Sequence, residues 1–174
     1  MSPRLPLEAR RLGDPALTLA HAALLEGLLA EPEWLRRVLG AADPEPIAIG
    51  AATVRLLSLR LAAASARALG GESDPDLIGR AVGVPWPSGL SLAAALGSLA
   101  PADELRGRML ASALRRHLRE RFGERWFLEA GAAGLLRELW LEGGDLDASG
   151  LARELGSSGL DPGPLVAEAV EGLG

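Results

Sequence analysis

The apolar side chains of this chain are almost all aliphatic, and this limits the kind of core that it can build. Apolar residues make up 48% of the 174 residues, whereas aromatic residues make up only 3%. Leu and Ala are strong helix formers, while aromatic and β-branched residues are the ones enriched in strands. A chain of this length usually buries one core. The sequence therefore predicts an all-α fold, a single irregular bundle of about 7–9 helices with no significant sheet.

The clearest local signal lies in the segment Arg11–Glu26, which predicts the start of a helix. Asp14 is a suitable N-cap, because its carboxylate can accept hydrogen bonds from the free N–H groups of the first turn. Pro15 suits the first helical position, where a missing N–H has no consequence. Residues 1–13 are expected to form an N-terminal arm, and residues 14–174 a single helical domain.

Further helices are expected where apolar periodicity is bounded by Gly, Pro or Asp. The expected helices cover residues 14–30, 31–39, 47–69, 75–82, 90–99, 101–122, 126–141, 147–155 and 162–173, with a rigid Pro-Trp-Pro loop over 84–89. Three of these helices have a candidate aspartate cap, namely Asp74, Asp147 and Asp161.

The helix over residues 101–122 is expected to have one buried and one solvated face. The apolar side carries Leu110, Leu114, Leu118 and Phe122, and the polar side carries Arg108, Ser112, Arg115, Arg116 and Arg119. Interleaved glutamates offset part of the positive charge, so a solvated face is the prediction rather than a nucleic-acid surface.

Composition and charge exclude several classes of site and partner. The net charge of −5 provides no attraction for phosphate backbones or anionic lipid, so we expect neither nucleic acid nor a membrane as a partner. The absence of Cys excludes disulfides and thiolate sites. All 18 basic residues are Arg, which indicates the coding bias of a GC-rich bacterium. No apolar run of about 18 residues lacks charge and no signal-peptide pattern is present, so we expect a cytoplasmic protein.

The two histidines do not form a recognisable metal or proton-transfer motif. His21 and Glu26 are five residues apart, so they face different directions on a helix, and no H-x-x-x-H pair exists. We expect His21 to be a partly buried structural residue and His117 to lie at a helix edge. The serines lack a G-x-S-x-G elbow, and the glycines lack a phosphate-binding pattern.

Two stretches of the chain carry a family resemblance. The first consists of Arg11-Leu12-Gly13-Asp14, Thr18, Ala22, Leu24 and Glu26. The second consists of Leu105-Arg106, the run from His117 to Phe127, Ala130-Gly131, Leu136-Arg137-Glu138-Leu139-Trp140 and Leu160-Asp161. The chain resembles, in this order and over most of its length, the C-terminal helices of zinc metallopeptidases of the thimet oligopeptidase and oligoendopeptidase F superfamily.

The resemblance implies a peptidase-like helical domain without peptidase chemistry. The H-E-x-x-H zinc helix of that superfamily is missing, and Leu19 occupies the position of its zinc-binding glutamate. Glu26 matches a supporting carboxylate, so Glu26 and His21 remain as a possible residual site. Ala100 and Glu104 occupy positions where the superfamily has substrate-binding tyrosines. The resemblance therefore implies a pseudoenzyme with no catalytic residues, no metal and no cofactor.

The preferred functional hypothesis is a non-catalytic helical interaction or scaffold protein. An apolar helical face that packs on the missing half of a peptidase would be left exposed, and a protein partner or self-association would cover it. A split zinc metallopeptidase, whose H-E-x-x-H comes from another chain, is one alternative. A small-ligand-binding helical domain is the other.

Overall fold

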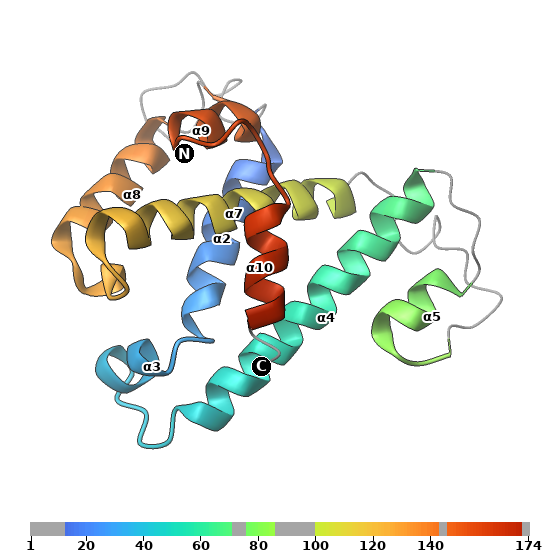
Figure 1. Ribbon diagram of the computed structural model, residues 1–174, viewed down its shortest axis with the longest axis horizontal. Helices are drawn as coiled ribbons and strands as arrows, with labels where there is room; N and C mark the ends of the chain where they lie inside the picture. The colour runs from blue at the N-terminus through green and yellow to red at the C-terminus, as the bar shows by residue number, and fades with distance from the viewer. Residues whose placement is uncertain (1–12, 71–75, 86–99, 143–145, 172–174) are drawn as a thin grey trace. The chain divides into compact units, whose positions relative to one another are not determined.

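The chain folds into helices joined by turns, as the computed structural model in Figure 1 shows. The structure describes residues 13–70, 76–85, 100–142 and 146–171. Over these ranges no strand is present, which confirms the all-α fold. The candidate cap Asp74, the helix expected over 90–99 and most of the loop expected over 84–89 lie outside the described residues.

Two compact units make up the chain, one of residues 1–26 and 106–174 and the other of residues 27–105. The first unit contains most of α2 (Pro15–Leu28) and α7 (Ala100–Phe122), the short 3-10 helix η1 (Trp126–Leu128), α8 (Ala130–Glu142), α9 (Ala148–Glu154) and α10 (Gly163–Glu171). The second unit contains α3 (Pro32–Val38), α4 (Glu45–Leu69) and α5 (Leu77–Val82).

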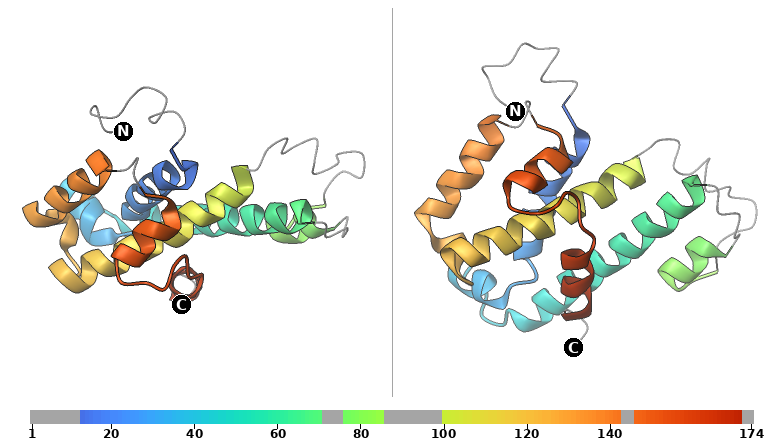
Figure 2. Two further views of the ribbon diagram at one scale, coloured as in Figure 1. Left: turned by 90° about the horizontal axis from the view of Figure 1, so that it is seen from above. Right: turned by 45° about the horizontal axis from the view of Figure 1, so that its top comes forward.

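The first unit is built around the crossing of α2 and α7, which both views of Figure 2 show. Gly107 lies at the crossing, where a Cβ would be 2.7 Å from the Cβ of Leu19 and 3.1 Å from the carbonyl oxygen of Ala16. Both helices contribute fully or nearly fully buried side chains, namely Ala16, Leu17, Ala20, Leu24, Leu110, Leu114 and Leu118. A residue without a side chain at this point allows the two backbones to approach closely.

Two predicted helix caps are confirmed in the first unit. The Asp147 carboxylate accepts a hydrogen bond from the Gly150 N–H at 2.6 Å, and the Asp161 carboxylate accepts one from the Gly163 N–H at 2.8 Å. These carboxylates satisfy donors that have no partner within the first turn of a helix. Gly123 ends α7 with a φ of +82°, a backbone conformation that favours glycine.

The single helix predicted over residues 126–141 is wrong, because the chain breaks between η1 and α8. Glu129 takes an extended conformation at the break, with φ −90° and ψ 121°. The break allows α8 to fold back on the end of α7, where a Cβ on Gly131 would lie 2.9 Å from the Phe122 ring. It also leaves Trp126 buried. The tertiary packing of these aromatic side chains thus overrides the local helical preference.

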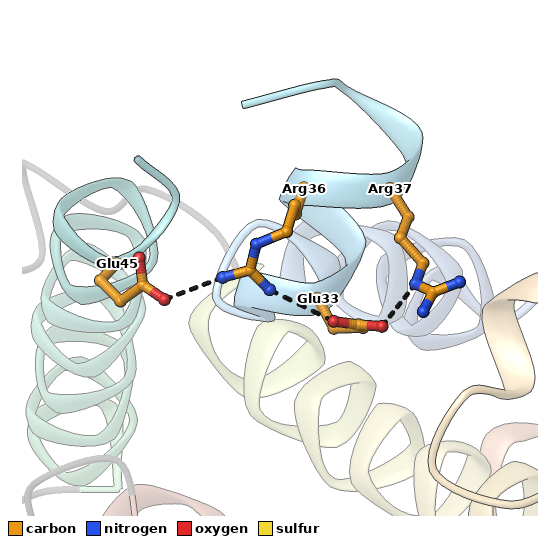
Figure 3. Close-up of polar contacts among 4 residues, drawn as sticks. All are labelled: Glu33, Arg36, Arg37 and Glu45. Atoms are coloured by element: carbon orange, nitrogen blue, oxygen red, sulfur yellow. Dashed lines mark hydrogen bonds and ion pairs between the residues drawn. The ribbon is translucent and has the colours of Figure 1, made fainter. Parts of the chain in front are cut away.

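In the second unit, α3 and α4 are joined by a chain of surface ion pairs, shown in Figure 3. Arg36 contacts Glu33 of its own helix at 3.2 Å and Glu45 at the start of α4 at 3.0 Å, and Arg37 also pairs with Glu33. These side chains are largely exposed, so each pair adds little to stability. α4 begins at Glu45, two residues before the predicted start, because a proline is tolerated in the first helical turn.

The other end of α4 is covered by α5. Ala64 packs with Leu77, Ile78 and Ala81 in a small buried cluster, and Ala68 lies against it. Alanines on α4 allow the short α5 to approach closely, so a few small side chains are sufficient to bury this contact.

Candidate functional site

Asp14 connects three helices of the first unit. Its carboxylate accepts hydrogen bonds from the Ala16 N–H at 3.0 Å, from the Ala148 N–H at 2.9 Å and from both terminal nitrogens of Arg106. One side chain thus caps α2, pairs with α7 and caps the start of α9. The cap on α2 confirms the role predicted for Asp14, whereas its contacts with Arg106 and Ala148 could not be read from local sequence.

The contacts of the Asp14 carboxylate determine the direction in which its pKa is shifted. Burial by itself raises the pKa of Asp14, but the hydrogen bonds from Ala148, Arg106 and Ala16 outweigh burial and hold the pKa below its ordinary value. Hydrogen bonds and a nearby guanidinium both favour the charged form of a carboxylate. Asp14 is therefore ionised at neutral pH and acts as a structural anchor in the first unit.

We expect the protein to lose stability on acidification as Asp14 becomes protonated. Because the folded-state pKa lies below the ordinary value of about 3.9, the contribution of Asp14 is fully present above about pH 5 and is lost as the pH falls through the folded-state pKa. Urea unfolding from neutral pH down to about pH 2 should show the difference between the wild type and Asp14→Asn shrinking. A difference that stays constant with pH would contradict this role.

Leu19, which matches the zinc-binding position of the resembled superfamily, lies in the helix crossing. Its Cβ is the atom closest to the position that a Cβ on Gly107 would take, at 2.7 Å. The position is therefore used for packing between α2 and α7.

His21 is buried on α2 and stacks on Trp140 of α8. The two rings are parallel to within 1°, with centroids 5.4 Å apart, and Nδ1 of His21 lies 2.9 Å from the carbonyl oxygen of Leu17. Among the described residues, Nε2 of His21 has no hydrogen-bond partner. His21 is thus more deeply buried than the partly buried residue that the sequence predicts. His117, by contrast, is half-buried on α7.

Glu26 does not lie alone at the end of α2, because it faces a buried arginine of α7. Arg108 approaches the Glu26 carboxylate at 3.7 Å, and Arg115 approaches Glu168 of α10 at 3.4 Å. Arg108, Ser112 and Arg115 are all buried, so the solvated face predicted for them is wrong. Carboxylates from helices distant in sequence compensate these charges, which is what allows an arginine to be buried.

The remaining predicted positions belong to the start of α7. Ala100 is the first residue of this helix, and Glu104 is half-buried one turn later. Both belong to the second unit, whereas Leu19, His21 and Glu26 belong to the first. Within the described parts of the chain, no group of three His, Asp or Glu side chains could hold a metal ion. No family model, curated protein or solved structure matches the chain.

An exposed apolar surface on α4 is the feature that the sequence analysis missed. Its members recur three and four residues apart, and we call them the α4 stripe: Ile47, Gly50, Val54, Leu57 and Leu61. The four large side chains among them are 48%, 60%, 39% and 37% exposed, respectively. Residues at this spacing lie on one face of a helix. The spacing is visible in the sequence, which predicts a helix over residues 47–69 without indicating that this face of it is exposed.

The α4 stripe belongs to a long apolar helix with little cover. Only 17% of the apolar window within Glu45–Ala68 is buried, and this helix is long and apolar enough to cross a membrane by length and composition alone. Exposed apolar side chains that form one continuous row indicate a contact surface, whereas isolated ones are common on any protein.

Proposed function

We propose that the chain is a helical interaction protein that binds a protein partner through the α4 stripe. The observation that carries this proposal is the row of four large aliphatic side chains exposed along one face of α4. Removing such a row from water on association favours the complex, because burial of apolar surface is the dominant favourable contribution to most protein–protein association. An amphipathic helix that offers this kind of face is a recurrent binding element in proteins.

Two contacts in the first unit support the proposal that the protein is not a catalyst. Leu19 is used in the helix crossing, and Glu26 contacts the buried Arg108. The split-peptidase alternative needs a metal-binding residue where Leu19 stands, and the ligand-binding alternative has no specific observation in its favour. The peptidase ancestry itself stays a prediction.

Insertion of α4 across a membrane is disfavoured by its arginines. Arg55 and Arg60 lie near the middle of the helix. Each arginine at the centre of a bilayer costs about 2.5–3.5 kcal/mol on insertion scales. Neither arginine belongs to the α4 stripe, so a protein partner bound to the stripe leaves both outside the apolar row.

A photo-crosslinking amino acid at Val54 tests the proposal in extracts of the producing cells. We expect a defined protein adduct from Val54, because this side chain lies in the α4 stripe and is 60% exposed. The matched control is Ile49, which is 68% exposed on the same helix but lies about 120° away from the stripe. Identical adducts from both positions would contradict a specific surface.

A further inference from the structure

The α4 stripe has the residue order of a two-stranded parallel helix pair. When a heptad is counted from Ile47, the β-branched Ile47 and Val54 take the first two a positions, Leu61 takes the third, and Leu57 takes a d position. This combination favours two parallel strands in coiled coils. Gly50 takes the other d position, and nothing lies within 4 Å of a Cβ built on it. A facing helix can therefore approach closely beside Gly50.

The positions that flank the α4 stripe are almost free of charge. Ala51 and Ser58 lie on one side, and Thr53 and Arg60 on the other. The Thr53 hydroxyl donates to the Ile49 carbonyl at 2.8 Å, and Nη2 of Arg60 donates to the Arg80 carbonyl at 2.7 Å, so both polar groups are engaged within their own chain.

This charge pattern is compatible with a second copy of α4 as the partner. Charged flanks usually decide which partner a helix selects and exclude the wrong ones. Arg60 is the one charged residue among these four flanking positions, so two copies of α4 meet with little like-charge repulsion, and no acidic partner is needed for complementarity.

The α4 stripe is continuous with a helix contact that already exists in the chain. The same spacing continues from Leu61 to Ala64 and Ala68, which α5 covers with Leu77 and its neighbours. The end of this face with Ala64 and Ala68 is therefore already packed against a helix, α5. The exposed end, from Ile47 to Leu61, has the same residue spacing with larger side chains.

We infer that the α4 stripe is the interface of a homodimer, in which α4 of a second copy lies parallel to α4 of the first. This inference rests on the proposed function and identifies its partner as a second copy of the chain. Two-fold symmetry places each residue of the stripe opposite the same residue of the second copy. Ile47 thus faces Ile47, and Val54 faces Val54.

Sedimentation velocity of the purified protein tests the dimer. We expect the wild type to form dimers as its concentration rises, and Leu57→Glu to weaken dimerisation about tenfold or more, because a charge would enter the apolar interface. Ile49→Glu is the matched control and should dimerise like the wild type. Circular dichroism of both variants checks that the helices are retained. A wild type that stays monomeric up to submillimolar concentration would overturn the inference.

Single cysteines test the orientation, since the chain has no Cys of its own. Under mild oxidation, Ile47→Cys should give a covalent dimer in high yield, because a parallel pair brings the two positions together. Ile49→Cys, which lies off the stripe, should stay largely monomeric. A dimeric protein in which neither Ile47→Cys nor Val54→Cys forms the disulfide would overturn the parallel arrangement.

Other occupants of the stripe give different results. A monomer that forms a specific adduct through Val54 in extracts would overturn the dimer but leave the proposed function intact. A monomer that floats with phosphatidylcholine vesicles would overturn both. A monomer that forms no adduct through Val54 in extracts would also overturn both the dimer and the proposed function.

Discussion

Replacing Asp14 with alanine is expected to lower the free energy of unfolding by about 2–4 kcal/mol. The substitution removes the acceptor for the Ala16 and Ala148 N–H groups and the Asp14 carboxylate that pairs with Arg106. Because the Asp14 side chain is only 10% exposed, water replaces these contacts poorly. Urea unfolding followed by circular dichroism would measure the loss.

Asp14→Asn separates the cap from the ion pair. Asparagine is as good an N-cap as aspartate, so it retains the hydrogen bond to Ala16 and loses the charge that faces Arg106. We expect about half of the loss seen for alanine, since hydrogen bonds to charged groups are worth about 1.5–3 kcal/mol. An alanine variant as stable as the wild type would show that the three connections of Asp14 do not hold the unit together.

Replacing Gly107 with alanine is expected to destabilise the protein by about 2–3 kcal/mol, although the same change usually stabilises a helix by up to about 1 kcal/mol. The new Cβ would lie 2.7 Å from the Cβ of Leu19, 3.1 Å from the Ala16 carbonyl oxygen and 3.2 Å from the Ala20 nitrogen. Two of these atoms belong to the backbone of α2, so α2 and α7 would have to separate. Thermal unfolding should show a lower midpoint.

Gly134→Ala is the matched control for the helix crossing. Gly134 also lies within a helix, but nothing is within 4 Å of a Cβ at that position. We expect this variant to gain stability, because only the helix preference changes. If Gly107→Ala and Gly134→Ala had the same effect, the close approach of α2 and α7 would be refuted.

Local signals in the sequence were sufficient to predict most helix ends. Asp14 with Pro15, Asp147 and Asp161 each start a helix through contacts with the next few residues, and Gly123 ends one through its own backbone conformation. Such signals depend on contacts within one helical turn, so they do not depend on how the helices pack against one another.

The burial of Arg108 and Arg115 could not be predicted, because it depends on partners distant in sequence. Glu26 and Glu168 reach these arginines only after α2 and α10 have packed on α7. The break at Glu129 has a similar origin, since it serves the packing of α8 against the end of α7. Helix periodicity alone cannot tell a solvated charged face from a buried and compensated one.

The α4 stripe was readable from the sequence but not as an exposed surface. The spacing from Ile47 to Leu61 marks one apolar face, and such a face is more often buried within the same chain. Only the structure reveals that this face is open and that α5 covers just the end with Ala64 and Ala68.

Crosslinking from Val54 and Ile49, compared in the wild type and in the Leu57→Glu background, tests whether the α4 stripe is a binding surface. We expect one dominant adduct from Val54, its loss when Leu57 becomes Glu, and no comparable adduct from Ile49. If the dimer is correct, the mass of this adduct is twice the 18.1 kDa of the chain. Equal labelling from Val54 and Ile49, unaffected by Leu57→Glu, would contradict the claim that the α4 stripe is a binding surface.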